Sequence, residues 1–186
     1  IGLLVGAVAL HGWLHSTEYH TVFPHLAMAS HGGPAVFIGI CMLVAAMGKS
    51  AQIPVGGWLP RAMEGPTASS AVFYGGLSVH MGVYLLIRSA PLLEQAPLAR
   101  LWILGIGGVT AVMAALSGQV SADAKSGLAY ATISQVGLMF VEVALGMPRL
   151  ALIHLAAHSL LRYYQFLRTP STLQDALARR RAGGSV

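Results

Sequence analysis

Long apolar runs separated by short polar segments make up most of the chain, and their lengths are typical of membrane-spanning helices. A spanning helix needs about 20 consecutive residues that are predominantly apolar. The runs that approach or reach this length are Ile1–Leu14, Pro34–Trp58, Ala68–Ile87, Leu101–Val120, Gly127–Gly146 and Leu150–Leu167. We therefore expect an all-α membrane protein, a polytopic transmembrane helix bundle of about six spans whose first helix is truncated.

Composition agrees with this interpretation and excludes several classes of site. Mean hydropathy is +0.68 and only 9% of residues are charged, whereas soluble domains contain about a quarter. The single cysteine, Cys41, lies in an apolar run, which excludes a disulfide framework and a cysteine-based metal or iron–sulfur site. No glycine-rich phosphate loop follows a strand pattern. We therefore expect no cofactor on this chain.

Basic residues gather near the C-terminus. Residues 1–168 form the predicted transmembrane domain, and residues 169–186 form a basic polar tail with Arg179, Arg180 and Arg181. Such a tail suits the anionic face of a membrane better than nucleic acid, because no aromatic or basic surface accompanies it. Counting basic residues in alternate loops predicts a cytoplasmic C-terminus, and we expect a bacterial inner membrane. The chain opens inside an apolar run without methionine, which favours a partial sequence.

A polar, proline-containing stretch interrupts the second apolar run. It reads GKSAQIPVGGWLPRAMEGPT, from Gly48 to Thr67. Pro54 cannot donate a hydrogen bond to the carbonyl of Ser50, so we expect one broken helix with that carbonyl freed beside Lys49. A lysine near the bilayer midplane costs several kcal/mol and indicates a functional site. The alternative is a shorter helix from which Lys49 reaches the membrane surface.

Histidines in two of the predicted spans form a candidate proton relay. His154, His158 and Arg162 follow one another at intervals of four residues and share one helix face. Histidine titrates near physiological pH, so the pair suits proton transfer. Buried structural histidines and a metal site remain alternatives, although no third ligand lies nearby in sequence. In the third span His80 and Tyr84 are also four apart, with a relay or a structural role open.

The fifth predicted span begins beside a lysine and carries a polar face. Lys125 is either an interfacial lysine or part of the relay, and Tyr130, Ser134 and Gln135 could carry water into the bundle. Glu142, near the far end, can be interpreted as reaching the interface. Glycines in the sequence GIGGV, residues 105–109, are expected to permit close helix packing.

Three of these motifs together resemble the antiporter-like subunits of respiratory complex I, especially the NuoL branch. The family also includes Mrp-type cation/proton antiporter subunits and related hydrogenase and inorganic-carbon transporter subunits. The resemblance is carried by GKSAQIPVGGWLPRAMEGPT, by DAKSGLAYATISQVGLMF from Asp123 to Phe140, and by ALIHLAAHSLLR from Ala151 to Arg162. The motifs occur in the family's order and extend over most of the chain.

The resemblance implies a hydrated polar axis along which protons move through a larger assembly. Lys49 would match the lysine at the helix break, Lys125 the central lysine, and His154 and His158 the relay histidines. Arg162 stands where the family commonly has lysine, and arginine cannot release its proton. Where the family often has histidine in the third span this chain has Tyr74, and His80 lies further along.

Three functions follow from the resemblance as expectations. The first is a proton-translocating membrane subunit of an NADH:quinone oxidoreductase (complex I)-like assembly, without a redox centre of its own. The second is a subunit of a cation/proton antiporter or inorganic-carbon transporter that lacks quinone chemistry. The third is a fragment or scaffold that does not conduct protons. The expected partners are other membrane subunits and the lipid bilayer.

Overall fold

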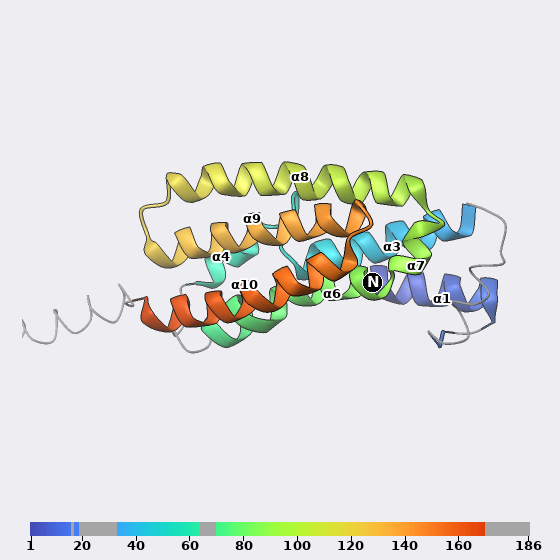
Figure 1. The fold of residues 1–186 in the computed structure, drawn as a ribbon, viewed down its shortest axis with the longest axis horizontal. Coiled ribbons are helices and arrows are strands. Elements are labelled where there is room, and N and C mark those ends of the chain that lie inside the picture. Colours follow the sequence, from blue (N-terminus) through green and yellow to red (C-terminus); the bar gives the residue numbers. More distant parts are fainter. Residues whose placement is uncertain (16, 19–32, 64–69, 170–186) are drawn as a thin grey trace, which may run out of the picture.

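A computed structural model describes residues 1–15, 17–18, 33–63 and 70–169. All secondary structure in this part is helical, and the elements form an elongated bundle in which the longer helices run along one axis (Figure 1). The α-helices are α1 (Gly2–Leu14), α3 (Gly33–Lys49), α4 (Trp58–Ala62), α6 (Met81–Arg88), α7 (Ala90–Glu94), α8 (Pro97–Gln119), α9 (Ala124–Ala144) and α10 (Pro148–Arg168). Most of the segment between the first two predicted runs, and the basic tail, lie outside the described residues.

Two of these helices, α8 and α9, are long and apolar enough to cross a membrane. Within the described residues α1 and α3 are also apolar but shorter. Helix α10 has the length of a span but carries two histidines and several basic residues, which lower its mean hydropathy. The all-helical class predicted from the apolar runs is confirmed.

The third predicted span is not one regular helix. It consists of a π-helix, η1 (Ser70–Leu77), a 3₁₀-helix, η2 (Ser78–His80), and α6. Wide π turns followed by a tight 3₁₀ turn change the rotation per residue, and such irregularity within a helix often marks a functional position. Here the irregular part ends at His80. The segment between the third and fourth predicted runs also contains a short helix, α7.

Glycine brings α8 and α9 into close contact. A Cβ atom on Gly107 would lie 2.7 Å from the carbonyl oxygen of Gly137, and one on Gly137 would lie 2.7 Å from that of Gly107. Only residues without a side chain allow two helix backbones to approach this closely. The packing role expected for the glycines of residues 105–109 therefore holds for Gly107, whereas Gly105 and Gly108 face open space.

Local sequence signals account for the ends of α9 and α10. The Asp123 side chain accepts a hydrogen bond from the Ser126 backbone N–H at 2.9 Å, which caps the start of α9. Gly146 has a φ of +81°, a conformation that terminates helices and that glycine adopts readily. Pro148 then begins α10, where its missing N–H costs nothing. A tight antiparallel hairpin of α9 and α10 results.

Helix α3 ends at Lys49, and helical structure resumes at Trp58 in α4. Ala51 between them has a φ of 51°, and the Ile53–Pro54 peptide bond is cis. The Ser50 carbonyl is not freed, contrary to expectation, because the Gln52 side-chain amide donates to it at 2.9 Å. The Ile53 N–H donates to the Thr110 hydroxyl of α8 at 3.2 Å, so a neighbouring helix completes the hydrogen bonding.

Candidate functional site

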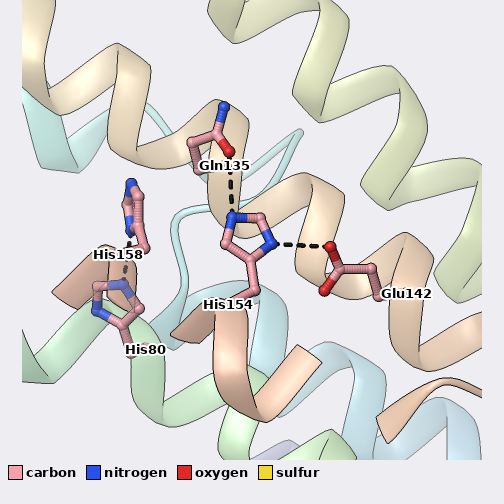
Figure 2. Close-up of polar contacts among 5 residues, drawn as sticks. All are labelled: His80, Gln135, Glu142, His154 and His158. Atoms are coloured by element: carbon pink, nitrogen blue, oxygen red, sulfur yellow. Dashed lines mark hydrogen bonds and ion pairs between the residues drawn. The ribbon is translucent and has the colours of Figure 1, made fainter. Parts of the chain in front are cut away.

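The three predicted relay histidines, His80, His154 and His158, lie together where η2, α9 and α10 meet (Figure 2). The ring nitrogens His80 Nε2 and His158 Nδ1 are 3.0 Å apart, and both side chains are buried. The rings of His154 and His158 meet edge to face, with their centroids 6.0 Å apart. His80 and His158 are separated by 78 residues, so only the fold brings them together.

Arg162 determines which nitrogen of His158 carries the proton. Its Nε–H donates to His158 Nε2 at 3.0 Å, and its Nη1 donates to the Gln165 side-chain oxygen at 2.8 Å. Arginine has no acceptor, so His158 Nε2 must present its lone pair. A neutral His158 therefore donates from Nδ1 to His80. The hydrogen bonds run in one direction, from the arginine through His158 to His80.

His154 makes a second set of contacts, to α9. Its Nδ1 lies 2.8 Å from Glu142 Oε1, and its Nε2 lies 3.2 Å from Gln135 Oε1 (Figure 2). A neutral imidazole donates from one nitrogen only. When His154 is protonated, both nitrogens can donate to these oxygens, and its contact with Glu142 is then an ion pair between imidazolium and carboxylate.

Glu142, which was interpreted from the sequence as reaching the interface, contacts the histidine cluster. Its side chain is 17% exposed, and its paired oxygen faces His154 rather than solvent. Two signals could have identified it. Gln135 and Glu142 are seven residues apart and so share a face of α9. In a hairpin that turns near Pro148, Glu142 and His154 are also equally distant from the turn.

The remaining polar residues of α9 lie in different surroundings. Lys125 is buried, with 5% of its surface exposed. The Ser134 hydroxyl donates to the Ala111 carbonyl at 2.8 Å and so ties α9 to α8. Ser134 and Gln135 also line an open groove of about 380 Å³ between these helices. Tyr130 and Pro54 line a smaller cavity of about 170 Å³ beside the segment that separates α3 from α4.

Lys49 lies apart from the histidines. Its side chain is exposed and lines an open groove of about 410 Å³ between α3 and α6, together with Tyr84 and Arg88. No hydrogen bond or ion pair within the described part of the chain joins Lys49 to the histidine cluster. Tyr84 is half-exposed in this groove and is not paired with His80. The sequence spacing alone therefore did not indicate the partner of His80.

The geometry of the histidine cluster is suited to moving protons. Imidazole nitrogens lie within hydrogen-bond distance of another imidazole and of a carboxylate. The 6.0 Å between the His154 and His158 centroids is a separation that a bridging water can span. Among the described residues, no group of three or more His, Cys, Asp or Glu side chains is arranged to hold a metal ion.

Comparisons with known proteins agree on one family. The family model described as "NADH:quinone oxidoreductase/Mrp antiporter, TM" matches residues 1–181. NADH-ubiquinone oxidoreductase chain 5 of Rhizopus stolonifer is 41% identical over 172 residues, which are 92% of this chain and 26% of that protein. Chain 5 of Metridium senile is 38% identical over 189 residues, covering 100% of this chain and 31% of that protein.

A solved structure has the same fold over most of this chain. The structure of the Mrp complex from Dietzia sp. DQ12-45-1b matches with a TM-score of 0.83 and 32% sequence identity. The match covers 89% of this chain and 19% of that one. This chain thus spans less than a third of the length of the proteins that it matches.

Proposed function

Because the chain belongs to the NADH:quinone oxidoreductase/Mrp antiporter transmembrane family, we propose that it is the proton-transferring part of a larger membrane subunit. The subunit would work within a complex I-like assembly, beside other membrane subunits and in contact with lipid. The observation that carries the proposal is the buried hydrogen bond between His80 and His158, extended by Arg162 and followed by the pair of His154 and Glu142. Buried titratable groups in an apolar bundle are costly and are kept where they serve a function.

In this proposal α3 and α4 are the two halves of one broken transmembrane helix, and the chain crosses the membrane about six times. The two helices follow one another along the bundle axis (Figure 1). Lys49, at the end of the first half, would exchange protons with an adjacent part of the assembly through its groove. Lys125, buried at the start of α9, would link that exchange to the histidines.

Arg162 has a different role from a relay lysine. It holds a fixed positive charge and fixes the hydrogen bonding of His158, but it cannot pass on a proton. Proton transfer would then run through His154 and His158 without a terminal lysine on α10. We place the C-terminal arginines on the cytoplasmic side of a bacterial inner membrane.

A second function, cation/proton antiport without quinone chemistry, is favoured by one observation. The fold matches a chain of an Mrp complex at a TM-score of 0.83. The same proton path would serve either function, because the path needs only titratable groups in order and no redox centre. What differs is the process elsewhere in the assembly that drives the protons.

The proposal is tested on the complete subunit in its assembled complex, reconstituted in vesicles that contain a pH-sensitive dye. Lys49→Ala removes the titratable group at the helix break, so we expect proton translocation to be lost while the complex still assembles. Arg61→Ala, which removes an exposed basic residue of α4, is the control and should translocate normally. Translocation by Lys49→Ala at the wild-type rate would contradict the proposal.

A further inference from the structure

Glu142 is unusual among the acidic residues of the described chain. The others are Glu18, in a connecting segment, Glu94, in the short helix α7, and Asp123, which caps α9. Of these four residues, Glu142 alone lies within a long helix, and its partner is His154 rather than a lysine or an arginine. Its second oxygen, Oε2, is buried and has no hydrogen-bond partner among the described residues.

An unpartnered buried carboxylate oxygen is costly, about 1–3 kcal/mol or more for a charged group. A purely structural ion pair would be expected to satisfy both oxygens. At Glu142 one oxygen holds His154 and the other keeps its lone pairs available. A carboxyl group that accepts and releases a proton needs such a free acceptor position.

The positions of Glu142 and His154 along their helices show toward which end of the bundle the carboxylate lies. Glu142 lies two residues before the end of α9, and His154 lies six residues after the start of α10. His158 is one further turn away from the hairpin, about 6 Å along the axis. The path from His158 through His154 to Glu142 therefore leads toward the α9–α10 turn (Figure 1).

The other side of His154 faces toward the opposite end of the bundle. Its Nε2 contacts Gln135, which lines the open groove between α8 and α9. That groove is also lined by Gln119 and Gly127, which lie near the α8–α9 turn. His154 thus lies between Gln135, at the wall of this open groove, on one side and Glu142 on the other.

We infer that Glu142 is a proton-transfer residue that connects the histidine relay to the membrane face at the α9–α10 turn. In the step, the N–H bond at His154 Nδ1 breaks and an O–H bond forms at Glu142 Oε1. Imidazolium and carboxylate become neutral imidazole and carboxylic acid, so the net charge of the pair does not change. A water molecule then takes the proton from the acid and restores the carboxylate, and the reverse sequence takes a proton up.

This inference depends on the proposed proton transfer, and the experiment separates the two. The complete subunit in its complex is reconstituted in vesicles, and proton translocation is compared among wild type, Glu142→Gln, Glu142→Asp and Glu94→Gln. Glutamine keeps an oxygen that can accept from His154 but cannot ionise. We expect Glu142→Gln to translocate at least about tenfold more slowly, since a positioned acid or base typically contributes more than that.

Glu142→Asp should recover most of the rate, because it restores an ionisable carboxyl group on a shorter side chain. Glu94→Gln makes the same substitution on the exposed surface of α7 and should be neutral. Wild-type translocation by Glu142→Gln would overturn the inference and leave the proposed function standing. A wild type that translocates no protons would instead overturn the proposed function, and the inference with it.

Infrared difference spectroscopy of the wild type keeps the inference testable if Glu142→Gln does not assemble. On acidification a carboxylic acid C=O band should appear while the carboxylate band is lost. Glu142→Asp should shift that band. A spectrum identical in wild type and Glu142→Asp would mean that Glu142 does not take up protons, and would overturn the inference.

Discussion

Residues 50–57, the segment between α3 and α4 and hereafter the break, use polar side chains differently from the histidine cluster. At the break, side chains satisfy backbone groups: Ser50 donates to the Val79 carbonyl at 2.6 Å, and Gln52 donates to the Ser50 carbonyl. In the cluster, side chains bind one another, and those that titrate occupy the centre. The side chains of residues 50–57 therefore mainly hold the backbone, whereas the cluster brings titratable side chains into contact with one another. In an apolar bundle, polar residues that bond to the backbone therefore need to be distinguished from titratable residues that bond to one another, before either is assigned a role.

The largest effect is expected where α6 crosses α3 beside the break. A Cβ atom on Gly82 would lie 2.5 Å from the Ala46 carbonyl oxygen and would collide with the Ser50 hydroxyl. Gly82→Ala should therefore force the two helices apart, at a cost of about 1–3 kcal/mol or more. We expect the amount of assembled complex to fall sharply, as measured by native gel electrophoresis of solubilised membranes.

Gly108→Ala is the matched control, because a Cβ atom there meets nothing within 4 Å. It should assemble like the wild type. Normal assembly of Gly82→Ala would show that the break and α6 are not held together as described. The claim that the break holds α3 and α6 together would then be contradicted.

A smaller effect is expected from Ser50→Ala. The substitution removes the 2.6 Å hydrogen bond to the Val79 carbonyl, which is buried and would lose its side-chain partner. The expected loss is about 1–3 kcal/mol of unfolding free energy, seen as a lower midpoint of thermal unfolding. Proton translocation should remain, because the hydroxyl is not on the proposed path.

Ser159→Ala removes an exposed hydroxyl bonded to the Ala156 carbonyl and should leave the midpoint unchanged. If Ser50→Ala abolished translocation without lowering the midpoint, Ser50 would have to be counted, with Lys49, as part of the proton path. The break and the histidine cluster would then both contain residues that take part in proton transfer.

The lengths of the apolar runs were enough to predict α8, α9 and α10, and the spacing of polar residues was enough for part of the site. The apolar runs predicted the long helices to within a few residues at each end, and the family resemblance drawn from three motifs is confirmed. The four-residue spacing of His154 and His158 placed both rings on one face of α10. These predictions depend only on residues that are close in sequence.

The features that were missed depend on distant contacts or on irregular backbone. The partner of His80 is 78 residues away. Pro54 provides no backbone donor for the Ser50 carbonyl, and the Gln52 side chain, whose conformation depends on this irregular backbone, donates to it instead. The π and 3₁₀ turns before His80 give no periodic signal, because they interrupt the period itself.

The measurement that tests the central claim most directly is proton translocation by His158→Gln in the reconstituted complex. His158 is the group that joins His80 to Arg162, and glutamine can keep hydrogen bonds there but cannot be protonated. The account predicts an assembled complex whose translocation is at least about tenfold slower than the wild type, with His11→Gln, at a histidine on the exposed side of α1, unaffected. Wild-type translocation by His158→Gln would contradict the claim that protons pass through the histidine cluster.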